Sequence, residues 1–256
     1  MLDSELLLSI SEDCNRSDII AHSDKVVSDI DYQRYKNLLS LRRNGFPIHY
    51  LIGKKEFFSI DFFVSSNTLI PRPETELLVD TALSLFGKNE KINILELGTG
   101  CGAIALTLKK NRPMFSVTAT DKSIKALDMA KINADKLGLE VNFVVSDWFK
   151  KVKYNNYDLI ISNPPYVEER ALEFNNNLKY EPRLALYGGK TGLNSLNLII
   201  SEAIFHLNSG GYLVLEHGAE QAKKVIEFAL ENKYISCQSL KDMNNKDRCL
   251  IAQRSI

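Results

Sequence analysis

The sequence has few cysteines and no long apolar segment. Its four cysteines, Cys14, Cys101, Cys237 and Cys249, form no C-x-x-C pair, and no histidine stands at zinc-ligand spacing from them. No apolar run reaches the length of a membrane span, and the first residues are acidic where a secretion signal is basic. We therefore expect a cytoplasmic protein with reduced thiols, no bound metal and no membrane anchor.

The sequence also lacks an excess of charge of either sign. Lys plus Arg and Asp plus Glu number 32 each, so the formal net charge at pH 7 is +0. Proteins that hold many phosphates usually present a positive surface, so dedicated nucleic-acid binding is not expected. Hydrophobic residues make up 45% of the 256 residues, which is enough for a packed globular core.

Hydrophobic periodicity divides the chain into three parts. Up to residue 45 apolar residues recur at helical spacing, and Gly45 and Pro47 then supply a C-cap and a helix stop. Residues 56–64 are aromatic and β-branched, which is typical of a hairpin. From residue 74 strands and helices alternate, which indicates an α/β fold with a parallel sheet. We expect a helical domain at 1–45, a β-hairpin linker at 46–73 and an α/β domain at 74–256.

The α/β part contains seven expected strands and five expected helices. The expected strands are 93–97, 116–120, 141–145, 157–162, 211–216, 236–240 and 248–252. The expected helices are 74–85, 102–110, 123–137, 193–207 and 220–232.

A glycine-rich turn follows the first of these strands. Glu96 and Leu97 end the strand, residues 98–102 read G-T-G-C-G, and a helix begins at once. Glycines let the backbone approach a ligand closely, and the helix N-terminus offers unpaired N–H groups. The dinucleotide order is G-x-G-x-x-G, whereas this order is G-x-G-x-G with an acid beside it. That acid suits a ligand with a positive ammonium group, such as S-adenosylmethionine.

Acidic residues follow the next two strands. Asp121 ends one of them, where doubly wound folds place an acid that accepts hydrogen bonds from ribose hydroxyls. Asp147 and Trp148 end the other, where a carboxylate and an aromatic ring hold adenine. In the alternative reading, Asp121 only caps the helix that starts near Ser123 and Trp148 belongs to the core. Because these features lie on successive strand ends, we favour a nucleoside cofactor.

The stretch Asn163-Pro164-Pro165-Tyr166 follows the strand at 157–162. The two prolines stiffen the turn, so the carbonyls of Asn163 and Pro164 become rigid acceptors, and the Asn163 side chain adds another. A planar NH₂ group fits these acceptors, with Tyr166 flat against it. Methyl transfer depends mainly on alignment, so no general base is required. The alternative is a proline-rich loop that merely ends a strand.

These motifs resemble those of class I amino-methyltransferases, which include DNA adenine and protein glutamine methyltransferases. Other stretches resemble the release-factor glutamine methyltransferases, the PrmC or HemK family. They are residues 47–53, 56–58, 69–76, 146–149, 181–182 and 184–186. One departure is Cys101, where the family more often has a small hydroxyl residue. The backbone makes the contact at this position, so we expect little effect.

The resemblance implies a Rossmann-like, seven-stranded class I methyltransferase sheet whose last strand is antiparallel, with a small N-terminal helical domain that docks the protein substrate. It implies S-adenosyl-L-methionine as methyl donor and S-adenosyl-L-homocysteine as product. The implied acceptor is N5 of the glutamine in the Gly-Gly-Gln motif of peptide-chain release factors, whose methylation modulates translation termination.

The expected site residues combine the resemblance with the arguments above. The cofactor-binding residues are Gly98, Thr99, Gly100, Cys101, Gly102, Asp121, Asp147, Trp148 and Asn163. The substrate-binding residues are Asn163, Pro164, Pro165 and Tyr166, of which Asn163, Pro164 and Tyr166 are expected to be catalytic.

Two other functions use the same residues. An adenine N6-methyltransferase would apply the chemistry of residues 163–166 to a base flipped out of its stack, although the zero net charge disfavours it. A non-catalytic binding protein would use the same fold, although intact Asn163 and Tyr166 disfavour that. The role of residues 72–76 stays open between a helix start and a lining of the substrate mouth. We expect a monomer that acts on a transient partner.

Overall fold

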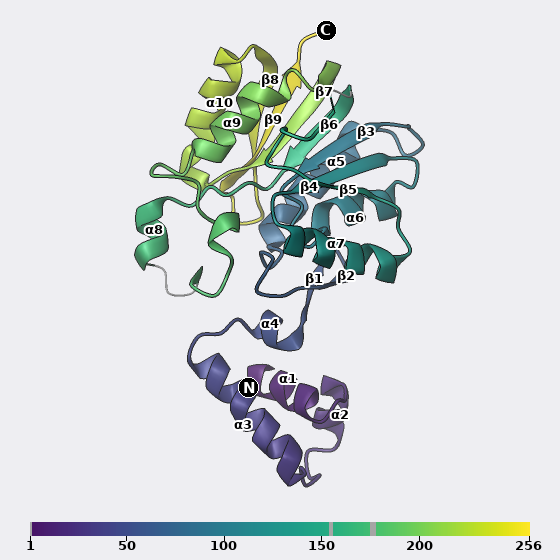
Figure 1. Cartoon of the computed structure of the whole chain (residues 1–256), viewed down its shortest axis with the longest axis vertical. Coiled ribbons are helices and arrows are strands. Elements are labelled where there is room, and N and C mark those ends of the chain that lie inside the picture. The colour runs from purple at the N-terminus through teal and green to yellow at the C-terminus, as the bar shows by residue number, and fades with distance from the viewer. Residues whose placement is uncertain (1, 154–155, 175–177) are drawn as a thin grey trace.

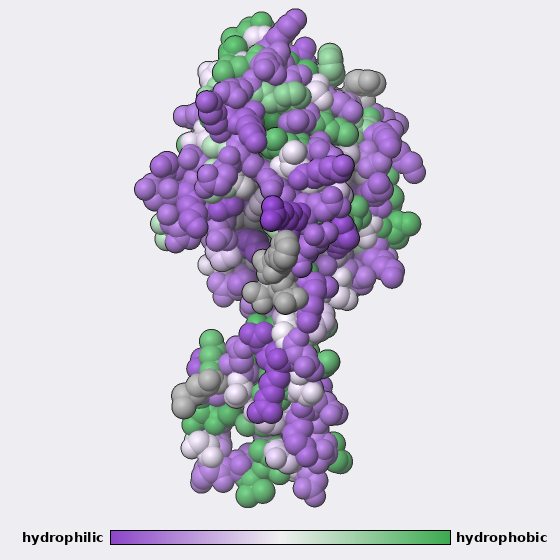
Figure 2. All heavy atoms as spheres, turned by 90° about the vertical axis from the view of Figure 1, so that its left-hand side faces the viewer, coloured by the Kyte–Doolittle hydropathy of each residue, from purple (hydrophilic) through white to green (hydrophobic). Residues whose placement is uncertain are grey.

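The computed structural model describes residues 2–153, 156–174 and 178–256. Met1 and residues 154–155 and 175–177 of the predicted domains lie outside the described residues. A small helical part and a larger α/β part are joined by a narrow waist (Figures 1 and 2). The helical part contains α1 (Leu2–Ser11), α2 (Arg16–Ala21), α3 (Asp29–Arg43) and α4 (Ile48–Ile52), and a hairpin of β1 (Lys54–Phe57) and β2 (Ile60–Phe63) follows it.

Local capping and a buried leucine organise the helical part. The Ser28 hydroxyl accepts a hydrogen bond from the backbone N–H of Asp31 (3.2 Å) and so caps α3. Leu7 of α1 is fully buried, and the ion pair between Arg42 Nε and Asp3 Oδ2 (2.7 Å) links α3 to α1. Helix α3 ends at Arg43, just before the predicted stop at Gly45.

Helix α4 was not predicted from the sequence. Pro47 follows the end of α3 and serves as the N-cap of α4, because proline is tolerated where a helix begins. Gly53 ends α4 with a left-handed φ of 76°. The predicted domain division at residue 45 stays a prediction.

The hairpin packs into the core of the α/β part. Phe57 and Phe62 are buried in the same apolar cluster as the first helices of that part. Asn133 locks the hairpin in place, because its Oδ1 accepts from Phe63 N (2.7 Å) and its Nδ2 donates to Phe63 O (3.0 Å). The hairpin therefore forms one structural unit with the helices beneath it.

The α/β part alternates strands and helices as predicted. Its elements are η1 (Pro73–Thr75), α5 (Glu76–Leu85), β3 (Asn93–Leu97), α6 (Ala103–Asn111), β4 (Ser116–Asp121), α7 (Ile124–Leu137), β5 (Asn142–Val145), β6 (Tyr157–Ser162), α8 (Glu169–Phe174), η3 (Arg183–Ala185), α9 (Asn194–Ala203), β7 (Leu207–Glu216), η4 (Ala219–Gln221), α10 (Ala222–Glu231), β8 (Tyr234–Lys241) and β9 (Asp247–Arg254). The helix α8 was not predicted, and β7 and β8 are longer than expected.

In the described chain these strands form a seven-stranded sheet in the order β5-β4-β3-β6-β7-β9-β8. Neighbouring strands from β5 to β7 are parallel, and β9 is antiparallel to both β7 and β8. This order confirms the predicted fold class, including the antiparallel last strand. No described helix combines the length and apolar character needed to cross a bilayer.

The sheet has a helical layer on each face. Successive residues of β3 point to opposite faces, so Ile94 packs with α5, α6 and α7 while Leu95 packs with α9 and α10. Both residues are fully buried. Because helices cover both faces of the sheet, a ligand can reach the sheet only at the edges where the strands end. The carboxyl ends of β3 to β6 lie side by side at one of these edges.

Candidate functional site

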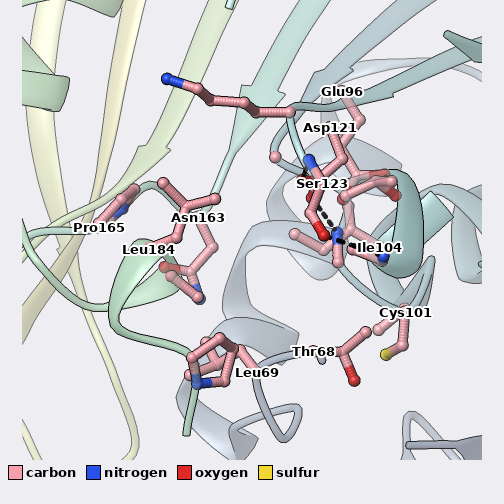
Figure 3. Close-up of a pocket in the computed structure, with 18 of the residues that line it drawn as sticks. Thr68, Leu69, Glu96, Cys101, Ile104, Asp121, Ser123, Asn163, Pro165 and Leu184 are labelled. Carbon is pink, nitrogen blue, oxygen red and sulfur yellow. Dashed lines mark hydrogen bonds between the residues drawn. The ribbon is translucent and has the colours of Figure 1, made fainter. Parts of the chain in front are cut away.

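A cavity lies at the carboxyl ends of the central strands. Figure 3 shows Asp121, Ser123 and Ile104 on one side of it, and Asn163 and Leu184 on the other. The predicted site residues that line it are Gly98, Thr99, Gly100, Cys101, Asp121, Asp147, Trp148, Asn163 and Pro165. We call the side around residues 98–102 and Asp121 the cofactor wall, and the side around Asn163 and Pro165 the acceptor wall.

The glycine turn of the cofactor wall needs its glycines. Gly98, Gly100 and Gly102 have φ values of 72°, 59° and 87°, in the left-handed region that other residues avoid. Gly102 does not line the cavity. A Cβ there would come within 2.9 Å of Leu106 and 3.2 Å of Ala130, so its small size lets α6 and α7 approach. Contact between Gly102 and the cofactor stays a prediction.

Asp121 braces the cofactor wall from the end of β4. Its Oδ2 accepts from Gly100 N (2.9 Å) and its Oδ1 from Ser123 N (2.8 Å). Burial raises the pKa of Asp121, and these backbone hydrogen bonds oppose the rise. Ser123 is the residue that caps α7, through Ala126 N. A carboxylate has about four acceptor positions, so Asp121 retains capacity for ribose hydroxyls.

Glu96 is more deeply engaged with the protein than the sequence suggested. Its Oε2 accepts from the Thr99 hydroxyl (2.6 Å) and from Ala105 N (3.0 Å), and only 1% of its surface is exposed. Burial raises its pKa to about 7. Glu96 lines the cavity, and it also satisfies a free N–H group in the first turn of α6. It therefore ties the glycine turn to the helix.

Trp148 and Asp147 also line the cavity, just after the end of β5. Trp148 has a φ of 52°, and its carbonyl accepts from the Ser146 hydroxyl (2.7 Å). The ring packs against the core and also lines the cavity, and its contact with adenine stays a prediction. The hydrogen bond from Lys150 (2.6 Å) lowers the pKa of Asp147, which Lys122 also approaches at 3.5 Å.

The acceptor wall is built on the loop after β6. Asn163 and Pro165 line the cavity, and the Asn163 Nδ2 donates to the Thr75 hydroxyl (3.0 Å). Pro164 and Tyr166 are not among the lining residues. The Tyr166 hydroxyl donates to Glu216 Oε1 (2.8 Å), so Tyr166 stands behind the wall, and its expected contact with substrate stays a prediction.

Glycines at 188–192 support the loop from behind. A Cβ on Gly188 would come within 2.7 Å of the Tyr166 Cα and within 2.8 Å of the Pro165 carbonyl oxygen. Gly188 N also donates to Val167 O (2.9 Å). This segment therefore packs against the backbone of the acceptor wall.

Sequence reasoning missed several residues of the acceptor wall. Thr75 lines the cavity, and Glu216 lies directly behind it. Arg72 Nη2 pairs with Glu181 Oε1 at 2.5 Å, and Glu181 Oε2 also accepts from Ile70 N (3.2 Å). Glu216 ends the predicted strand at 211–216, so the argument that found Asp121 would have found it. Within residues 72–76, Pro73 opens η1 while Arg72 and Thr75 line the cavity, and a role at the substrate mouth stays a prediction.

These groups fit S-adenosylmethionine. The N-terminus of α6 suits a carboxylate, Glu96 suits an ammonium group, Asp121 suits ribose hydroxyls and Trp148 suits adenine. Among the described residues, no group of three or more His, Cys, Asp or Glu side chains is arranged to hold a metal ion. The sheet order and this site define a class I S-adenosylmethionine-dependent methyltransferase.

Comparison with known proteins specifies the family. The Methyltransferase small domain matches residues 73–179, and the PrmC N-terminal domain matches residues 1–53. The release factor glutamine methyltransferase of Shewanella oneidensis is 38% identical over 255 residues, covering 98% of this chain and 88% of that protein. That of Buchnera aphidicola subsp. Schizaphis graminum is 41% identical over 254 residues, with 98% and 92% covered. This chain belongs to the release factor glutamine methyltransferase family.

A solved structure shows the same fold. A methyltransferase from Pyrococcus furiosus superposes with a TM-score of 0.62 at 24% identity, covering 85% of this chain and 100% of that chain. As a member of the release factor glutamine methyltransferase family, the protein described here uses S-adenosyl-L-methionine as its methyl donor.

Proposed function

We propose that this enzyme methylates the side-chain amide nitrogen, N5, of the glutamine in the Gly-Gly-Gln motif of peptide-chain release factors, and thereby modulates translation termination. The observation that carries the proposal is one cavity that joins the cofactor wall to Asn163 and Pro165 (Figure 3). The names of the relatives in S. oneidensis and B. aphidicola supply the acceptor protein.

The chemistry requires alignment more than acid–base catalysis. S-adenosyl-L-methionine supplies a methyl group bonded to a positively charged sulfur. The amide nitrogen of the acceptor forms an N–C bond while the C–S bond breaks, and the nitrogen loses one proton to water. The products are an N-methyl amide and S-adenosyl-L-homocysteine. Within this step the protein holds the nitrogen in line with the methyl carbon.

In this proposal the acceptor wall performs that alignment. The Asn163 side-chain oxygen and the Pro164 carbonyl accept the two N–H bonds of the glutamine amide, and Pro165 keeps the turn rigid. Tyr166, tied to Glu216, supports the turn from behind the cavity surface. Acceptors placed before the reaction cost no reorganisation during it. The cofactor contacts are those of the predicted cofactor-binding residues.

The N-terminal helices are proposed to dock the release factor. Ile20, Val26 and Ile30 of this part are 55%, 89% and 81% exposed. Apolar side chains are visible on the small part in Figure 2. Exposed apolar surface of this kind is typical of protein interaction sites. The helical part touches the α/β part beside the cavity, because the Tyr180 hydroxyl donates to Asn44 O (2.9 Å).

We also infer a cytoplasmic monomer that meets its protein substrate transiently and has no dedicated nucleic-acid site. Cys14, Cys101, Cys237 and Cys249 are all free, which suits a reducing compartment. The formal net charge of +0 supports a protein substrate over a polyphosphate.

The test is transfer of a labelled methyl group from S-adenosylmethionine to three samples: purified release factor, the same factor with its Gly-Gly-Gln glutamine changed to alanine, and DNA. We expect label in the first sample alone. Label in both release-factor samples would place the methyl group on another residue. Label in DNA alone would assign the enzyme to adenine methylation.

A further inference from the structure

A buried carboxylate lies behind the acceptor wall and accepts two hydroxyl hydrogen bonds. Glu216 ends β7, next to the end of β6, and is 1% exposed. Its Oε2 accepts from the Thr75 hydroxyl (2.6 Å), and its Oε1 accepts from the Tyr166 hydroxyl (2.8 Å). One carboxylate oxygen is therefore bound to Thr75, which lines the cavity, and the other to Tyr166, which belongs to the loop after β6.

The direction of these hydrogen bonds determines the orientation of Asn163. An ionised carboxylate only accepts, so Thr75 gives its single hydroxyl proton to Glu216. Toward Asn163 the Thr75 oxygen can therefore only accept, and the partner at 3.0 Å must be the amide NH₂ of Asn163. The amide oxygen of Asn163 then points away from Thr75, and Asn163 lines the cavity.

The groups around Glu216 shift its pKa in opposite directions. Burial raises its pKa, and the hydrogen bonds from Thr75 and Tyr166 and the positive charge of Arg248 oppose that rise, while Glu74 adds to it. Arg248 is itself held by Asp242 (3.2 Å). If Glu216 were protonated, it could donate to Thr75, and Thr75 could then donate to an Asn163 amide turned the other way.

We propose that Thr75 and Glu216 are positioning residues that keep the Asn163 amide oxygen facing the acceptor nitrogen. Neither residue needs to touch the substrate. The inference rests on the proposed function, because it assigns Asn163 the task of accepting the N–H of the glutamine amide. If the Asn163 amide were turned around, its NH₂ group would face the NH₂ group of the substrate glutamine. The glutamine would then lose a hydrogen-bond acceptor and gain a repulsive contact.

The central variant is Thr75→Val, which removes the hydroxyl and keeps the shape, with Thr75→Ser as the conservative rescue. Net hydrogen-bond energies near 1–2 kcal/mol correspond to a fall in kcat of about tenfold for Thr75→Val. Thr75→Ser should recover most of that loss, and Glu216→Gln should lower kcat at least as much as Thr75→Val. The Kd for S-adenosylmethionine should stay within about twofold in all three, because each cofactor-wall contact is retained.

Two controls distinguish positioning of Asn163 from a purely structural link between η1 and β7. Thr81→Val removes a different buried hydroxyl, one in α5 that contacts Cys249 Sγ at 3.9 Å, and should leave kcat unchanged. In an Asn163→Ala background, Thr75→Val should lower kcat no further, because residues that act through one another are not additive.

Methyl transfer to purified release factor by the wild type is the reference arm. If the wild type labels the factor but Thr75→Val keeps its kcat, or lowers it by the same factor with and without Asn163, positioning through Asn163 is refuted while the proposed function stands. If the wild type labels no release factor, the proposed function and this inference both fall.

Discussion

The two walls of the cavity are held together in different ways. On the cofactor wall, Glu96 binds residues three and nine positions away, and Asp121 binds Gly100, 21 positions away. On the acceptor wall, Asn163 binds Thr75 across 88 positions, and Thr75 binds Glu216 across 141. The first wall is one strand-turn-helix-strand unit, whereas the second exists only after distant elements have packed. Cofactor binding and acceptor alignment should therefore respond to different substitutions.

The largest difference between the effect on kcat and the effect on cofactor affinity is expected at Asn163. Asn163→Ala removes the side-chain acceptor, and losing one preorganised hydrogen-bonding group of this kind lowers kcat by about 10² to 10³. Calorimetry should find the Kd for S-adenosylmethionine changed by less than about threefold, since one neutral contact is worth little. Asn111→Ala, at the far end of α6, is the matched control. A large loss of cofactor affinity with normal kcat would move Asn163 to the cofactor wall.

The burial of Glu96 in the cofactor wall predicts how the free energy of unfolding changes with pH. Its pKa is about 7, above the ordinary 4.5 of a glutamate, so the folded protein binds more protons than the unfolded chain between these values. The stability associated with protonated Glu96 is full below pH 4.5 and is lost as the pH rises through 7. Relative to Glu96→Gln, the wild type should lose on the order of 3 kcal/mol of unfolding free energy across that range.

Denaturant titrations of both proteins at several pH values measure this difference. The Glu96→Gln comparison removes the contribution of all other titrating groups, because they are common to both proteins. A difference that stays constant with pH would show that Glu96 is ionised in the fold as it is in the unfolded chain.

Asp121 should show the opposite pattern to Asn163. Asp121→Asn leaves only one acceptor oxygen for Gly100, Ser123 and the ribose hydroxyls, and hydrogen bonds to charged groups contribute about 1.5–3 kcal/mol. The Kd for S-adenosylmethionine should rise about 10- to 100-fold, with kcat at saturating cofactor close to wild type. Asp128→Asn, an exposed acid on α7, is the control. Equal losses at Asp121 and Asn163 in both quantities would mean that the walls act as one.

The smallest effect is expected where the helical part meets the cavity. The Tyr50 hydroxyl donates to Thr68 O (2.6 Å), and Thr68 lines the cavity. Tyr50→Phe should cost about 1 kcal/mol and lower Tm by about 2–4 °C. Tyr32→Phe, on exposed α3, should leave Tm unchanged. Equal shifts in both variants would show that the Tyr50 contact adds nothing to the junction.

Prediction from sequence succeeded where the signal was local. The strands at 93–97 and 157–162 have the predicted ends, because apolar β-rich runs there stop at glycine or proline. The hairpin ends were less accurate, since Phe58 and Ser59 take left-handed φ values of 51° and 57° without the usual Asn or Gly. Helix α4 is too short for periodicity to reveal, and it is held by its packing against α1.

The sequence by itself determined the order of strands and helices, the glycine turn, and the acids and proline loop at successive strand ends. These depend on backbone preferences and on contacts within about 20 residues. Only the tertiary structure decided that Thr75 and Glu216 orient Asn163 and that Glu181 pairs with Arg72. It also placed Gly102 and Tyr166 behind the cavity surface. A hydrogen bond between residues a hundred positions apart leaves no local pattern, because sheet order and helix packing alone bring its partners together.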